Sequence, residues 1–116
     1  MAMLSIPGID IDTGIKRCGG NQSLYLRFLK SFAQDPSYAS LKNALRQGRP
    51  AEAFRHAHTL KGLTAQLSII GLTEPYANLC KILKAREENT CCKAQEAFDA
   101  IAPIHDRLIA ELLRLL

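Results

Sequence analysis

The side chains best suited to chemistry lie close together in residues 54–67, FRHAHTLKGLTAQL. An α-helix turns by about 100° per residue, and on such a helix the small and apolar residues fall on one side while His58 faces away from them. Lys61 shares the outward side with His58. A neutral imidazole nitrogen is a nucleophile, and a neighbouring ammonium group offsets the charge of phosphoryl oxygens. The pattern therefore suits reversible phosphorylation of His58. The apolar side consists of Ala53, Ala57, Leu60, Thr64 and Leu67.

Gly62 is an unusual residue inside this predicted helix, because glycine costs about 1 kcal/mol there relative to alanine. Helical side chains lean toward the N-terminus, so the residue four positions after His58 would normally cover it. Gly62 occupies that position and has no side chain. We therefore expect the imidazole to be open to a visiting molecule.

Helix-breaking and capping residues divide the rest of the chain into further helices. Asn21 is a good N-cap, Gly48 a natural stop, and Pro50 a good first residue of a helix. Pro103 is expected to bend or split the last helix. No window shows the strict alternation of a half-buried strand beyond IDID near residue 9. The predicted helices cover residues 13–17, 21–34, 36–47, 50–67, 72–88 and 89–116.

These elements predict an all-α fold, an antiparallel up-down four-helix bundle with a short extra N-terminal helix. Leu72, Tyr76, Leu79 and Leu83 form an apolar stripe at helical spacing. Leu24, Phe28, Leu29 and Phe32 form another, and Tyr38, Leu41 and Leu45 a third. The chain has 116 residues, 47% of them hydrophobic and 22% charged, which is typical of one globular domain spanning residues 1–116.

Several classes of protein are disfavoured by composition. No apolar run is long enough to cross a membrane, and the segment MAMLSIPGID lacks the basic and apolar regions of a signal peptide, so we expect a cytoplasmic protein. The net charge of +4 favours acidic partners, but the basic residues do not form the clustered stripe of a nucleic-acid-binding protein. The cysteines are Cys18, Cys80, Cys91 and Cys92; their spacing favours free thiols over disulfides or a metal site.

The sequence AHTLKG, residues 57–62, resembles the signature of histidine-containing phosphotransfer (HPt) domains. Residues 8–32, GIDIDTGIKRCGGNQSLYLRFLKSF, resemble the N-terminal segment of that family, including its Gly-Gly-Asn turn. Apolar positions after the motif also match, so the resemblance spans residues 9–86.

The resemblance implies a phosphorelay protein that exchanges a phosphoryl group between His58 and aspartates of response-regulator receiver domains, with a hybrid sensor histidine kinase upstream. It implies that the chain is a phosphocarrier and not an enzyme, with no cofactor of its own, and that the receiver supplies Mg²⁺. The absence of a Gly-rich phosphate loop agrees with the lack of a nucleotide site. Lys61, Gly62 and Lys84 are the residues expected to support the phosphoryl group. The expected docking residues are Phe54, Arg55, Ala65, Gln66 and Ile15.

Two residues depart from the family pattern. Ser68 stands where members commonly have Gly after the histidine helix. Cys80 stands where many members place a Gln or Glu that hydrogen-bonds the histidine ring and orients it. A thiol is a weak hydrogen-bond partner, so Cys80 is not expected to orient the His58 ring as the family residue does.

The remaining histidines and the tyrosines have plainer expected roles, and two other functions fit a helical bundle. His56 is expected at the boundary of the core, His105 in solvent or at a helix cap, and Tyr25, Tyr38 and Tyr76 in packing roles. An alternative function is a helical interaction module that binds receiver or kinase domains without being phosphorylated. A metal-binding bundle is a third, but the paired Glu-x-x-His motifs of ferritin-like sites are absent.

Overall fold

The computed structural model describes residues 6–116, and this part of the chain is built from α-helices without a strand. Residues 1–5 lie outside the described residues. They form the first half of MAMLSIPGID, the segment that is not expected to be a signal peptide. The prediction of an all-α fold is confirmed. The helices are α1 (Ile11–Arg17), α2 (Gln22–Ala33), α3 (Ser37–Arg46), α4 (Pro50–Gln66), α5 (Ile70–Ala85) and α6 (Thr90–Leu115).

Three helix boundaries lie where the capping residues predicted them, at Asn21, Gly48 and Pro50. The side chain of Asn21 accepts a hydrogen bond from the backbone N–H of Leu24, as expected of an N-cap. Gly48 ends α3 with a φ of 65°, a conformation that glycine adopts without steric cost. Helix α1 begins two residues earlier than predicted, because Asp10 caps it by accepting from the N–H of Thr13.

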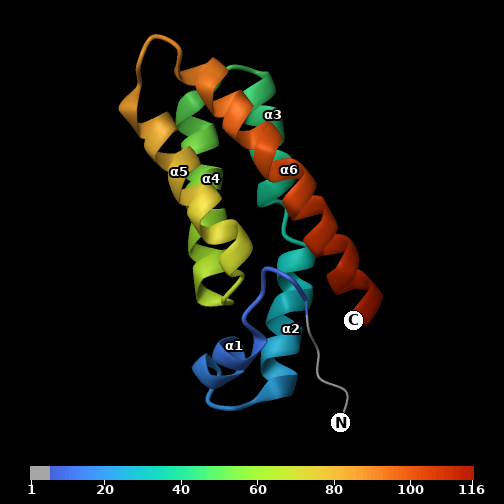
Figure 1. The fold of residues 1–116 in the computed structure, drawn as a ribbon. Helices are drawn as coiled ribbons and strands as arrows, with labels where there is room; N and C mark the ends of the chain where they lie inside the picture. The colour runs from blue at the N-terminus through green and yellow to red at the C-terminus, as the bar shows by residue number, and fades with distance from the viewer. Residues whose placement is uncertain (1–5) are drawn as a thin grey trace.

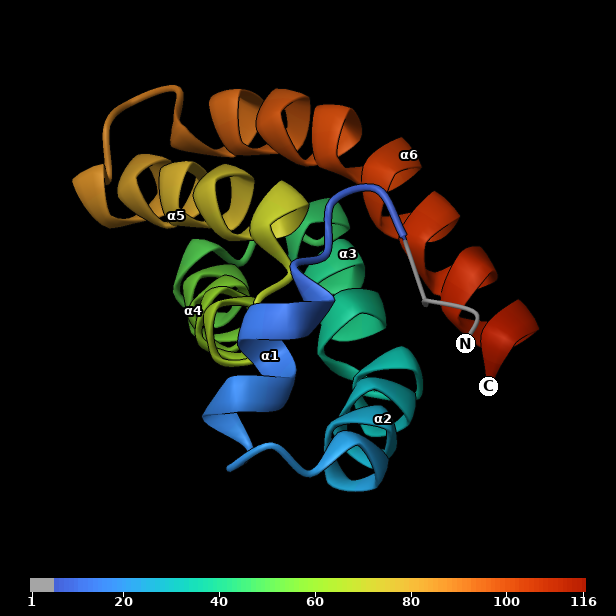
Figure 2. The same cartoon turned by 60° about the horizontal axis from the view of Figure 1, so that its bottom comes forward.

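The helices form the predicted antiparallel up-down bundle (Figure 1). Helices α2 and α3 run in the same general direction, and α4 runs antiparallel beside α3. Helix α5 is antiparallel to α4, and α6 is antiparallel to α5 and also contacts α3 and α2. The short helix α1 packs on α2 at one end of the bundle, next to the turn between α4 and α5 (Figures 1 and 2). Residues 8–20 are thus brought to the end of the helix that carries His58.

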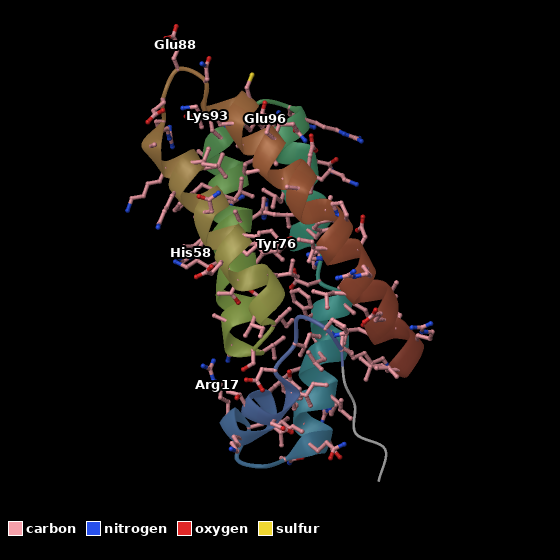
Figure 3. All side chains as sticks on the ribbon, viewed as in Figure 1. Arg17, His58, Tyr76, Glu88, Lys93 and Glu96 are labelled. Atoms are coloured by element: carbon pink, nitrogen blue, oxygen red, sulfur yellow. The ribbon has the colours of Figure 1, made fainter. Side chains whose placement is uncertain are left out.

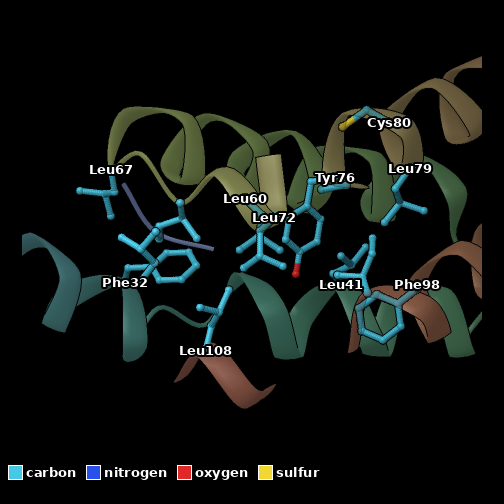
Figure 4. Close-up of a cluster of buried hydrophobic side chains, with 14 of the residues drawn as sticks. Phe32, Leu41, Leu60, Leu67, Leu72, Tyr76, Leu79, Cys80, Phe98 and Leu108 are labelled. Carbon is cyan, nitrogen blue, oxygen red and sulfur yellow. The ribbon is translucent and has the colours of Figure 1, made fainter. Parts of the chain in front are cut away.

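The apolar sides predicted for α4 and α5 form the core. All five residues of the α4 side are buried, from Ala53 to Leu67. The α5 stripe is also fully buried, and Figure 4 shows Leu72 and Tyr76 beside Leu60 of α4. Burying one large apolar side chain contributes about 1.5–3 kcal/mol, so these two faces fix the register of α4 against α5. The orientation of His58 follows from this register.

Two prolines lie inside helices. Helix α5 begins at Ile70, two residues before the predicted start, so Pro75 falls in its second turn and not in its first. The helix continues, since proline removes only the hydrogen bond to the carbonyl four residues earlier, that of Gly71. Helix α6 also continues through Pro103, and Figure 2 shows that it curves. Of the two outcomes predicted for Pro103, the bend is the one observed.

The prediction for His105 was wrong, because this residue is buried between helices and only 3% exposed. Its Nδ1 atom lies 2.7 Å from the hydroxyl oxygen of Tyr76, and its ring stacks on Tyr38 with 3.8 Å between the centroids. Burial lowers the pKa of His105 to about 4, and the nearby carboxylate of Asp106 opposes this shift. The packing roles predicted for Tyr25 and Tyr76 are confirmed, since both are fully buried.

The predicted apolar face of α2 and the C-terminal end of α6 are only partly buried. Phe28 was expected in the α2 stripe with Leu29 and Phe32, but it is 43% exposed. At the end of α6, Leu112 is buried while Leu113 and Leu115 are exposed. Both regions lie at the end of the bundle where fewer helices are available to cover them.

The cysteines predicted to be free are unpaired: Cys80 is buried, Cys18 half-buried, and Cys91 and Cys92 exposed. Within residues 6–116, no helix has the length and apolar content needed to cross a membrane.

Candidate functional site

His58 lies on the exposed side of α4, near the middle of the helix. Its neighbours Ala57 and Leu60 are completely buried, so the register that buries them turns the imidazole outward. Figure 3 shows His58 pointing away from the bundle. The prediction that His58 faces solvent is therefore confirmed. His56, two residues earlier, is half-buried, at the boundary position expected of it.

The imidazole of His58 is supported on one side and open on the other. The ring of Phe54, one turn earlier on α4, lies 5.9 Å from it between centroids, with 36° between the ring planes. On the opposite side, a Cβ atom added to Gly62 would meet no heavy atom within 4 Å. The space over Gly62 is thus open, although a methyl group there would not reach the ring. Only a longer side chain at position 62 would cover His58.

Lys61 and Cys80 lie near each other where α4 faces α5. Burial raises the pKa of the Cys80 thiol, and the positive charge of Lys61 opposes this rise. Lys61 is half-buried. Lys84 is exposed on α5, one turn after Cys80, and makes no ion pair within the described part of the chain.

Among residues 6–116, no group orients the His58 ring by hydrogen bonding. Within residues 6–116, the one hydrogen bond to a histidine ring is that of His105. Cys80 is 6% exposed and makes no hydrogen bond to His58. With Cys in place of Gln or Glu at position 80, both imidazole nitrogens lack a hydrogen-bond partner in the part of the chain that the structure describes.

Helix α1 is attached to the C-terminal end of α4 by Arg17, a residue that the sequence analysis did not select. Its guanidinium donates a hydrogen bond of 2.6 Å to the carbonyl oxygen of Ala65. A positive charge at the carbonyl end of a helix is also favoured by the helix dipole. Ala65 itself is exposed, while Ile15 is half-buried and packs against the core. Two of the predicted docking residues are thus held together at this end of α4.

A groove of about 240 Å³ lies between α2 and the same end of α4. Phe28 and Phe32 line it from α2, Leu63 and Gln66 line it from α4, and Asp35 also contributes to its wall. Gln66 was predicted to dock a partner, but Phe28 was missed because helical spacing assigned it to the core. A large exposed aromatic residue beside a groove is a typical feature of interaction surfaces.

The exposed side of α4 carries positive charge. Arg55 is exposed and Lys61 is half-buried, and no acidic residue occurs between Ala53 and Gln66. The one acidic residue of α4, Glu52, lies in its first turn, 3.7 Å from the guanidinium of Arg49. This arrangement attracts anionic groups to the surface around His58. No group of three or more His, Cys, Asp or Glu side chains among residues 6–116 is placed to hold a metal ion.

The chain matches no family model, no curated protein and no solved structure. The family resemblance therefore rests on the residues quoted for it and receives no support from these comparisons.

Proposed function

We propose that the protein is a phosphocarrier in which His58 accepts a phosphoryl group from an aspartyl phosphate of a receiver domain and passes it to another. The observation that carries the proposal is one exposed imidazole on the middle of a packed helix, with Lys61 three residues after it and open space over Gly62. The resemblance of residues 9–86 to HPt domains supports the same function.

In the proposed reaction an imidazole nitrogen of His58 attacks the phosphorus atom with its lone pair. The N–P bond forms as the P–O bond to the receiver aspartate breaks, and the aspartate leaves as a carboxylate. Such transfers have loose transition states, so the protein contributes mainly positioning and neutralisation of charge. In this proposal Lys61, three residues after His58 on α4, faces the equatorial oxygens, and Lys84 adds charge from α5.

The docking surface in this proposal surrounds His58 on α4 and continues to the end of the bundle. Phe54 and Arg55 lie before His58, and Ala65 and Gln66 lie two turns after it. The groove beside Phe28 extends the surface onto α2. A receiver's active site is rich in carboxylates, and the positive charge of α4 complements it.

The experiment is transfer of radioactive phosphate from phosphorylated receiver domains to the purified chain. The wild-type protein should acquire acid-labile, base-stable phosphate. His58→Gln should acquire none, whereas His56→Gln, a matched change two residues away, should label normally. Lys61→Ala should label roughly tenfold more slowly, as expected for loss of one charge-assisted interaction. Normal labelling of His58→Gln would refute the assignment.

The second candidate is an interaction module that binds receiver domains without taking phosphate. The observation that favours it is the absence of a hydrogen bond from Cys80 to the His58 ring. In this case the chain would bind receivers at the same surface but remain unlabelled, and His58→Gln would bind as the wild type does.

A further inference from the structure

Phe54 is the aromatic residue that packs against the His58 ring, at 5.9 Å between centroids. Because helical side chains lean toward the N-terminus, the ring of His58 lies over the turn that carries Phe54. Phe54 is half-buried and packs against the hydrophobic core, so it is itself held in place. The imidazole therefore rests on a side chain with one end anchored inside the bundle.

Packing is the main restraint that the described residues place on the orientation of this ring. Neither nitrogen of His58 has a hydrogen-bond partner within residues 6–116, and the thiol at position 80 does not supply one. The side of the ring toward Gly62 is open. The helix limits the first side-chain torsion of His58 to two rotamers. Without Phe54, the imidazole would be free to turn about its second torsion, and few of its orientations would direct a nitrogen at an incoming phosphorus atom.

We propose that Phe54 is a positioning residue that holds the His58 imidazole in the orientation needed for phosphoryl transfer. This inference rests on the proposed function. Phe54 makes no contact with the phosphoryl group in this role. It limits the orientations of the imidazole from one side of the ring, and the phosphoryl group approaches from the other side, over Gly62. The contact thus takes the place of a hydrogen bond to the ring.

The test must separate positioning from partner docking, since Phe54 lies on the proposed docking surface. Phosphoramidate serves as a second donor, because its phosphoryl group passes to the imidazole with loss of ammonia and no receiver is needed. The variants are Phe54→Leu, which removes the aromatic ring, and Phe54→Tyr, which keeps it. Circular dichroism verifies that each is folded, and NMR shifts of the His58 ring protons report the contact itself.

An aromatic pair of this kind contributes about 0.5–1.5 kcal/mol, which corresponds to a change in rate of about two- to tenfold. We expect Phe54→Leu to slow labelling by this factor with both donors and to shift the His58 ring protons. Phe54→Tyr should restore both. With the receiver as donor, Phe54→Leu should still be labelled more slowly than the wild type at saturating donor concentration.

Three outcomes would overturn the inference, and they differ from one another. If Phe54→Leu is slowed with receivers but labels at the wild-type rate with phosphoramidate, Phe54 acts only in docking. If Phe54→Tyr is as slow as Phe54→Leu, aromatic packing is not the cause. If the wild-type chain is labelled by neither donor, the proposed function fails and the positioning role falls with it; the NMR shifts then report a contact without that role.

Discussion

The hydroxyl oxygen of Tyr76 on α5 lies 2.7 Å from Nδ1 of His105 on α6, in the interior of the bundle. Stacking of His105 on Tyr38 of α3 joins a third helix to this pair. Burial raises the pKa of Tyr76, so its hydroxyl remains protonated, and burial favours the neutral imidazole. These three residues link α3, α5 and α6, whereas His58 lies on the outer side of α4.

His105 makes the stability of the fold depend on pH. Its pKa falls from 6.5 to about 4 in the folded state, so between these values the unfolded chain binds a proton that the folded chain does not. The free energy of unfolding should therefore decrease as the pH falls below 6.5, by about 2 kcal/mol from this group at pH 5. Urea unfolding at pH 7.5 and pH 5 measures the effect.

The control for this prediction is His105→Gln, which keeps a polar group but cannot be protonated. Its free energy of unfolding should be lower than that of the wild type at pH 7.5. At pH 5 the difference in free energy of unfolding between the two proteins should be smaller by about 2 kcal/mol. Parallel losses in the two proteins would show that His105 does not titrate in this way.

Gly14 and Gly62 both lie in helices, but replacing each by alanine should change the stability of the fold in opposite directions. A Cβ atom at Gly14 would collide with the ring of Tyr25, where α1 crosses α2, while one at Gly62 would enter open space. Gly14→Ala should therefore destabilise the fold by about 1–3 kcal/mol, and Gly62→Ala should stabilise it by up to about 1 kcal/mol. Thermal unfolding of the pair measures both. Equal effects would contradict the packing described for α1.

Covering His58 from position 62 should block the reaction without harming the fold. Gly62→Gln introduces a side chain that leans back toward His58, and it should lower the rate of phosphoryl transfer at least tenfold while the melting temperature is unchanged or raised. Gly62→Ala is the matched control, because a methyl group there does not reach the ring. Full activity of the Gln variant would mean that the partner does not approach over Gly62.

Removal of Arg17 should loosen α1 from the end of α4. Arg17→Ala loses the hydrogen bond to the carbonyl of Ala65, which contributes on the order of 1 kcal/mol. Amide hydrogen exchange in α1 should become faster, while exchange in α5 should be unaffected. Lys16→Ala is the control, since the neighbouring lysine is exposed and makes no such contact in the described part of the chain. Unchanged exchange in α1 would show that other contacts hold this helix.

The helices were predictable because local residues determine where they begin and end. Asn21, Gly48 and Pro50 act through their own side chains or backbone preferences, so one sequence is enough to place them. The outward direction of His58 was predictable for a similar reason, since periodicity alone separates it from Ala57 and Leu60.

The errors concern contacts between residues far apart in sequence. His105 follows Ile101 and precedes Leu108 at core spacing, so the helical pattern did contain the signal for its burial. Its partner Tyr76 is 29 residues away, and no local rule joins the two. Phe28 shows the reverse case: its spacing fits the core, but α2 lies at the end of the bundle and Phe28 is exposed there. The bond from Arg17 to Ala65 spans 48 residues and has no local signature.

The central claim is that His58 carries the phosphoryl group, and locating the phosphate in the intact chain tests it most directly. After incubation with a phosphorylated receiver, the chain is digested and analysed by mass spectrometry under alkaline conditions, which preserve phosphohistidine. We predict a single phosphate, on His58, within the peptide that contains residues 56–61. Phosphate found on His56 or on another residue, or none after incubation with receivers that label a known acceptor, would contradict the claim.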